Sequence, residues 1–236
     1  MTRLIFTTLA ATLALAGCDA APGRPRPEAR ELAPTEVMAF EPLYARNCAG
    51  CHGQAGRLGA ARALNDPVYL ALVPPERLRQ VIGAGIPGTA QPAFALSHGG
   101  SLTDPQIDVL VRGIEERWRR SDVVAGQTMP PYDAGQAAGR NAGDAERGRR
   151  VFTGACARCH GDDGRGGPRG GGIADPSYLA LVSDQHLRTS VIAGRSDLGM
   201  PDWRGDGGAA PLTAQQVSDV VAWLVAQRRP VPGRLP

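Results

Sequence analysis

The chain has 236 residues, enough for one or two domains, with 31 glycines, 20 prolines and only 5% aromatic residues. All 26 basic residues are arginines, and the formal charge of +3 is too mild to favour a nucleic-acid-binding protein. No apolar run is long enough to span a bilayer. Since so few large apolar side chains make a poor core, an apolar cofactor in each half would supply the missing buried surface.

The chain begins with the pattern of an export signal. An apolar run from Leu4 to Ala16 leads into the motif "LAGC", which ends at Cys18. This pattern is typical of a secretory signal peptide, and the cysteine resembles the lipidated residue of bacterial lipoproteins. We predict removal of residues 1–17, lipidation of Cys18, and a lipid-anchored protein on the periplasmic side, with the inner membrane as the expected one. An ordinary signal peptide that happens to contain Cys18 is the alternative.

A tether and a tandem repeat follow. Residues 18–34 are rich in proline, arginine and glutamate and have no apolar periodicity, so we expect a semi-extended segment. Beyond it, "DPVYLALV" recurs as "DPSYLALV" and "SLTDPQIDVLV" as "PLTAQQVSDVV", each 109 or 110 positions later. We therefore predict two domains, 35–125 and 144–236, joined by a loop-like linker, 126–143.

Within each repeat the sequence predicts short helices and an all-α fold. The expected N-caps are Thr35, Thr103, Asp144, Ser183 and Thr213. Two stripes at helical spacing are expected in the core: Ile107, Leu110, Val111, Ile114 and Trp118, and Val217, Val220, Val221 and Leu224. His186 falls on a helix face whose counterpart carries Arg77, so we expect it to be exposed and not a ligand.

Each repeat also carries a C-x-x-C-H motif. The residues are Cys48, Cys51 and His52, and then Cys156, Cys159 and His160. In an exported chain this motif is typical of covalent haem attachment, because both thiols reach the vinyl groups of one porphyrin while the histidine faces its iron. A zinc site shared by two C-x-x-C pairs and a thioredoxin-like pair are the alternatives. We predict two covalently bound haem c groups.

The sixth iron ligands are expected to differ between the repeats. In the second repeat, Met200 in "LGMPDW" is the candidate, because a soft thioether suits ferrous haem and raises its potential. The matching position in the first repeat is Gln91, a weaker ligand that would leave the iron weakly held or open. His98 and Met129 are the alternatives there. Each choice predicts a lower potential at the first haem.

Together, "CAGCH", "CARCH" and "GMP" make residues 35–229 resemble tandem class I c-type cytochromes. The chain is similar to the small cytochrome c domains associated with haem-copper oxidases and quinol-oxidising complexes. The resemblance implies short helices around each haem and electron transfer in a respiratory or photosynthetic chain. It also implies redox-protein partners or a membrane respiratory complex, no small-molecule substrate and no enzymatic activity. The alternative is a haem enzyme or a gas- or peroxide-reactive protein that uses an open first haem.

Overall fold

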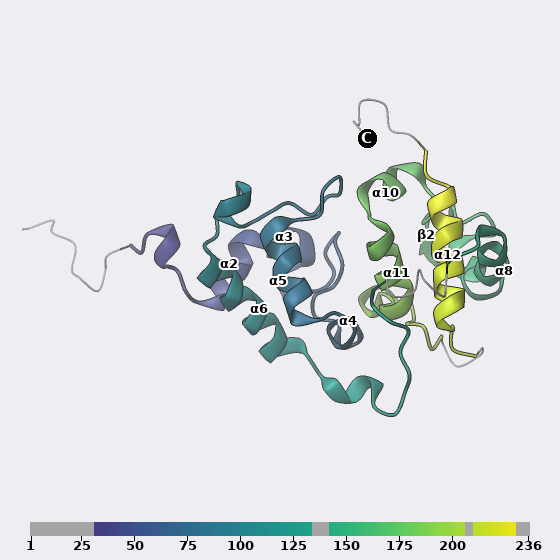
Figure 1. Cartoon of the computed structure of the whole chain (residues 1–236), viewed down its shortest axis with the longest axis horizontal. Helices are drawn as coiled ribbons and strands as arrows, with labels where there is room; N and C mark the ends of the chain where they lie inside the picture. Colours follow the sequence, from purple (N-terminus) through teal and green to yellow (C-terminus); the bar gives the residue numbers. More distant parts are fainter. Residues whose placement is uncertain (1–30, 134–141, 206–209, 230–236) are drawn as a thin grey trace, which may run out of the picture. The chain divides into compact units, whose positions relative to one another are not determined.

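The computed structural model of the chain describes residues 31–133, 142–205 and 210–229, and its elements are almost all helical (Figure 1). The predicted signal peptide and Cys18 lie outside these residues. The chain divides after Val37, and the described part before this point holds the 3₁₀ turn η3 (Pro34–Glu36). Among the described residues, no helix is long and apolar enough to cross a membrane.

The same series of helices occurs twice in the unit that begins at Met38. The first repeat contains α2 (Phe40–Asn47), α3 (Ala49–His52), α4 (Pro67–Leu72), α5 (Pro75–Ala84), η4 (Leu96–His98), α6 (Asp104–Trp118) and η5 (Ser121–Val124). The second contains α8 (Ala145–Ala155), α9 (Ala157–His160), β1 (Gly166–Gly167), β2 (Gly170–Gly171), α10 (Pro176–Leu181), α11 (Asp184–Ala193), η6 (Ser196–Leu198) and α12 (Ala214–Ala226). Helices α2 to α6 correspond in order to α8 to α12, which confirms the predicted all-α duplication.

Side-chain caps fix where most of these helices begin. Thr103 and Thr213 form reciprocal capping boxes at α6 and α12, and Asp144 and Ser183 cap α8 and α11, as predicted. The prediction for Thr35 was wrong. This residue lies within η3, and α2 starts only at Phe40, with no side chain capping it.

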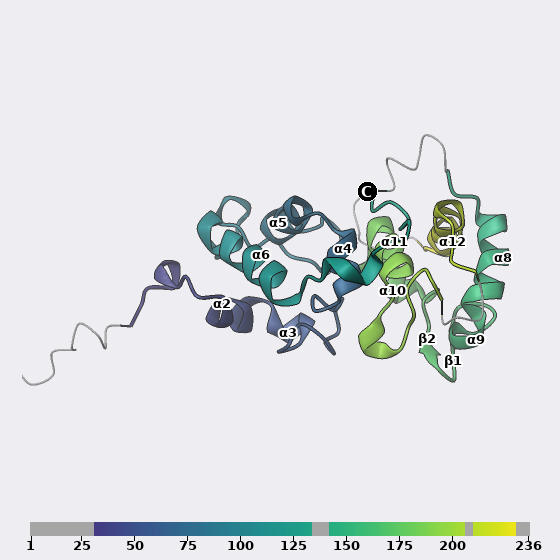
Figure 2. The same cartoon turned by 90° about the horizontal axis from the view of Figure 1, so that it is seen from below.

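The first and last helices of each repeat cross closely, with a glycine at each crossing. In the first repeat, Phe40 of α2 packs on Gly113 of α6, where a Cβ atom would come within 2.2 Å of the ring. In the second repeat the glycine lies on the first helix and the aromatic residue on the last: Gly148 of α8 faces Trp223 of α12. Figure 2 shows α8 and α12 side by side. The predicted stripes are core, since Ile107, Leu110, Ile114, Val217, Val220 and Leu224 are buried.

An apolar cluster spans both repeats. Val68 and Leu72 of α4 pack with Ile192 of α11, with Trp203, and with Val217 of α12, and all five side chains are buried. Residues of the predicted linker add to the cluster's edge. Burying shared apolar surface of this kind stabilises both partners, because neither repeat has many large apolar side chains to spare.

The glycine run after His160 contains the two short strands β1 and β2. It forms a minimal antiparallel hairpin in which Gly166 pairs with Gly171 and Gly167 with Gly170. Gly166 has a φ of 116°, a backbone conformation that residues with a Cβ rarely adopt. The hairpin lies against α9, so the run covers the end of the C-x-x-C-H motif.

Candidate functional site

The first C-x-x-C-H motif folds into one tight turn. Cys48 joins α2 to α3, and its carbonyl accepts the backbone N–H groups of Cys51 at 3.2 Å and His52 at 3.0 Å. His52 Nδ1 lies 2.7 Å from the carbonyl oxygen of Arg62. Because a carbonyl can only accept, Nδ1 carries the proton and Nε2 keeps its lone pair for a metal.

The second motif repeats this geometry. The carbonyl of Cys156 accepts from the backbone N–H groups of Cys159 at 3.1 Å and His160 at 3.0 Å. His160 Nδ1 lies 2.7 Å from the carbonyl oxygen of Gly171. A Cβ atom at Gly170 would lie 3.0 Å from the His160 ring, so any larger residue there would crowd the imidazole. Here too, Nε2 is the nitrogen left for a ligand bond.

The four motif thiols are unpaired, and two of them have shifted pKa values. Burial raises the pKa of Cys48 to about 11, with a smaller contribution from Cys51. Burial likewise raises the pKa of Cys156 to about 11, with a smaller contribution from Cys159. A redox-active dithiol shows the opposite shift, because its thiolate is stabilised. The motifs therefore lack the electrostatics of a thioredoxin-like pair.

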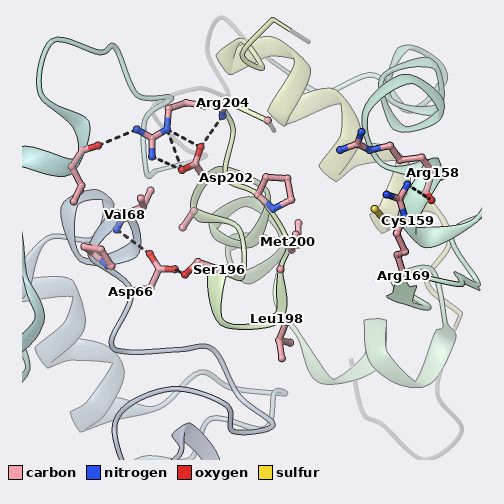
Figure 3. A pocket seen from close by; sticks show the side chains of 16 residues that line it. Asp66, Val68, Arg158, Cys159, Arg169, Ser196, Leu198, Met200, Asp202 and Arg204 are labelled. Atoms are coloured by element: carbon pink, nitrogen blue, oxygen red, sulfur yellow. Dashed lines mark hydrogen bonds and ion pairs between the residues drawn. The ribbon is translucent and has the colours of Figure 1, made fainter. Parts of the chain in front are cut away.

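Met200 borders a cavity of about 780 Å³ whose lining also includes Cys159. Figure 3 shows the two side chains reaching this space from different elements. The backbone N–H and carbonyl of Met200 both bond to Arg195, which fixes the loop after η6. From the first repeat, Asp66 and Val68 also line the cavity. Its volume is within the range of cofactor pockets.

Gln91 takes the same backbone place in the first repeat. The N–H of Ile86 donates to the Gln91 carbonyl at 3.1 Å, as Arg195 donates to Met200 at 3.0 Å. The next matched bonds join Phe94 to Ile82 and Trp203 to Ile192. The Gln91 side chain is half-buried, and its amide nitrogen lies 3.2 Å from the Pro92 carbonyl.

The two alternative ligands lie elsewhere. His98 is exposed in η4, and its Nδ1 is 3.0 Å from the Ser97 hydroxyl. Met129 packs at the edge of the apolar cluster that contains Val68 and Trp203. Among the described residues, neither His98 nor Met129 contacts His52.

Two site neighbours were not identified from the sequence. His186 is half-buried, so the expectation that it is exposed was wrong. Its pKa is lowered to about 4, mainly by burial and then by the nearby charges of Arg62 and Arg195. Arg62 is 5% exposed and touches both repeats. One sequence difference could have drawn attention to Arg62: the equivalent position of the second repeat is a glycine, Gly171.

The residues present fit a covalently attached porphyrin. Each repeat offers two free thiols one turn apart and an imidazole whose Nε2 is unblocked. In the second repeat a thioether and a thiol border the same cavity. This donor set matches haem c, in which thioether links and an axial histidine hold the group.

Comparison with known proteins agrees with this fit. The family described as "Cytochrome C oxidase, cbb3-type, subunit III" matches residues 35–112 and 143–224. The chain is 28% identical over 167 residues to "Cbb3-type cytochrome c oxidase subunit FixP" of Bradyrhizobium diazoefficiens, covering 69% of this chain and 53% of that protein. It is 28% identical over 162 residues to FixPc of Rhizobium leguminosarum bv. viciae, covering 67% and 51%.

The chain thus spans about half the length of the curated relatives it matches. Among solved structures, the Kuenenia stuttgartiensis reducing HAO-like complex Kustc0457/Kustc0458 is 15% identical with a TM-score of 0.47, covering 85% of this chain and 100% of that one. The family match includes both C-x-x-C-H motifs. The chain therefore belongs to the cbb3-type cytochrome c oxidase subunit III family, and its two cytochrome c domains bind two haem c groups.

Proposed function

We propose that this chain is a diheme electron-transfer subunit that delivers electrons to a membrane-bound respiratory oxidase. Cys48 and Cys51 hold one haem c, with His52 as its axial ligand. Cys156, Cys159 and His160 hold the other. When bound, haem c supplies one-electron chemistry at its iron, with a potential set by the axial ligands. The chain itself transforms no small-molecule substrate.

The observation that carries the proposal is the matched pair of histidine bonds. In both repeats a backbone carbonyl, of Arg62 or Gly171, fixes Nδ1 at 2.7 Å. This bond orients the ring, holds one tautomer and makes Nε2 a stronger donor. No other group in either motif needs to gain or lose a proton, as suits a carrier of electrons alone.

The second axial ligands give the two sites different potentials. We assign Met200 to the second haem, since its loop is fixed through Arg195 and it borders the cavity. Gln91 holds the equivalent place at the first haem. An amide oxygen is a harder ligand than a thioether and favours ferric iron. Electrons therefore enter at the first haem and leave through the second.

The relatives and the "LAGC" motif support a proposal for the partner and the location. The names of the curated relatives place them in a cbb3-type cytochrome c oxidase. We propose that this chain joins a complex of the same kind on the periplasmic side of the inner membrane. Lipid at Cys18, with residues 18–34 as a tether, anchors it there.

The test is to express the full chain with a cytochrome c maturation system. Intact mass should show two added haems, and variants Cys48→Ser/Cys51→Ser and Cys156→Ser/Cys159→Ser should each lose one. A redox titration should resolve two one-electron steps, with the methionine-ligated haem at the higher potential. A chain that carries no haem after export would overturn the proposal, and equal potentials or a reversed order would overturn the direction.

A second candidate function rests on Gln91. If its amide leaves the iron open, the first haem could react with carbon monoxide, nitric oxide or peroxide. Carbon monoxide added to the reduced protein separates the two functions. An unchanged spectrum supports a carrier, whereas a shifted Soret band for half of the haem supports a gas-reactive first site.

A further inference from the structure

Arg62 connects the two haem sites through its backbone and its side chain. Its carbonyl holds His52 Nδ1 in the first repeat. Its guanidinium reaches α11 of the second repeat, where Nη2 donates to Ser190 Oγ at 2.8 Å and Nη1 donates to the Gly194 carbonyl at 3.2 Å. Gly194 directly precedes Arg195, which holds the Met200 backbone.

The charge of Arg62 is buried without a counter-ion in the part of the chain that the structure describes. Its two hydrogen bonds go to neutral oxygens, and its guanidinium lies 5.2 Å from the centre of the Tyr69 ring. Nε is buried and has no hydrogen-bond partner among these residues. An unpaired buried charge and an unmet buried donor both destabilise a fold. An acceptor at Nε, preferably an anion, would remove both costs in the holo protein.

Nearby carboxylates are committed to other partners. Asp66 accepts from the N–H groups of Val68 and Tyr69 and from the Ser196 hydroxyl. Asp197 pairs with Arg195 at 2.8 Å. Neither forms an ion pair with Arg62 in the described residues, so no carboxylate of this part of the chain answers the guanidinium charge.

The surroundings favour an anion on the side of the second repeat. The pKa of His186 in α11 is lowered mainly by burial and further by the positive charges of Arg62 and Arg195. The segment that begins at Arg62 continues to Asp66 and Val68, which line the cavity shared with Met200. Arg62 and Arg195 thus place two positive charges beside His186 of the second repeat.

We propose that Arg62, supplied by the first repeat, is a positioning residue for the haem of the second repeat, and that its Nε–H donates to a propionate carboxylate of that haem. The inference rests on the proposed haem sites. A guanidinium bonded to a propionate neutralises its charge, so the ferrous state is favoured and the potential rises. One residue thereby orients an axial histidine of one site and tunes the other.

The test compares Arg62→Gln and Arg62→Lys with the unaltered, haem-loaded full chain by spectroelectrochemical titration. The second haem is recognised as the step that Met200→Ala displaces. We expect Arg62→Gln to lower the reduction equilibrium constant of this haem about tenfold, which is about 59 mV for one electron. Arg62→Lys, which keeps the charge, should recover more than half of the shift.

The matched control is Arg228→Gln. Arg228 also holds backbone carbonyls, those of Leu179 and Val182, but lies within one repeat and pairs with Asp184. Its loss should lower the melting temperature and leave both potentials unchanged. The proposal is wrong if Arg62→Gln leaves the second potential unchanged, if the first haem alone shifts, or if Arg228→Gln gives an equal shift.

If Arg62→Gln does not accumulate, the Arg62→Lys titration decides, because an ammonium keeps the charge but cannot reproduce the Nε–H bond. A measurable fall in the second potential that stays below half of the tenfold change supports the proposal. No shift at all, a larger shift, or a shift of the first haem alone contradicts it. A parent chain that binds no haem contradicts the proposed function instead, so the two failures are distinguishable.

Discussion

Gly148 of α8 lies directly against the backbone carbonyl of Asp219 in α12: a Cβ atom there would come within 1.9 Å of the oxygen. We therefore expect Gly148→Ala to force the two helices apart and to lower the free energy of unfolding by about 1–3 kcal/mol. Thermal unfolding followed by circular dichroism measures the change.

Gly154 on the same helix provides the control, since it is exposed and a Cβ atom added there would meet nothing within 4 Å. Gly154→Ala should stabilise the protein by about 0.5–1 kcal/mol, because alanine loses less backbone entropy in a helix. If Gly148→Ala and Gly154→Ala gave equal stabilities, the close crossing of α8 and α12 would not hold in solution.

Replacing Gln91 with methionine should make the first site resemble the second. The Gln91 carbonyl already accepts one of the two backbone hydrogen bonds that hold Met200, so a thioether introduced there starts from a matching loop position. We expect the potential of the first haem to rise by about 59 mV or more, a tenfold change in its reduction equilibrium. A titration showing no change would mean that residue 91 does not face the iron.

Met200→Ala should open the iron of the second haem. Without the thioether, the reduced protein should bind carbon monoxide at that site, and its potential should fall. Met129→Leu is the control, because Met129 packs at the edge of an apolar cluster and leucine conserves most of its volume. A spectrum altered equally by both substitutions would contradict the assignment of Met200.

Acid should weaken the loop that holds Met200. The hydrogen bonds from Arg195 lower the pKa of Asp197 to about 2, against opposing burial, from an ordinary value of 3.8. A lowered folded-state pKa stabilises the fold above the unfolded-state value, so this contribution is present at neutral pH and is lost as pH falls from about 4 to about 2. It amounts to about 1–2 kcal/mol.

Asp197→Asn should remove this dependence. Its unfolding free energy should be lower than that of the parent at pH 7 and should converge toward it at pH 2. Urea titrations at several pH values measure both curves. Parallel curves over the whole range would show that the Arg195–Asp197 pair contributes no linked stability.

Local patterns predicted the fold well because they act over a few residues. Thr103, Thr213, Asp144 and Ser183 cap helices as expected, since a cap needs only its own helix end. Thr35 failed because η3 intervenes and delays α2. Helix starts depend on such short irregular segments, which periodicity does not reveal.

The candidate site was predictable only in part. The two C-x-x-C-H motifs and Met200 follow from spacing, and Gln91 follows from aligning the repeats. The inter-repeat contacts of Arg62 and the half-buried position of His186 could not be predicted, because both depend on contacts between elements about 130 positions apart. A sequence pattern reports one helix face at a time and says nothing of what packs on it.

The apolar cluster shared by Val68, Leu72, Ile192 and Trp203 has a consequence for how the two halves behave. If the chain were cut between the two repeats, each fragment would expose its share of this apolar surface to water, and the fragments would self-associate. The intact molecule should instead melt in a single cooperative transition, so that neither electron-carrying half survives alone when the other is lost.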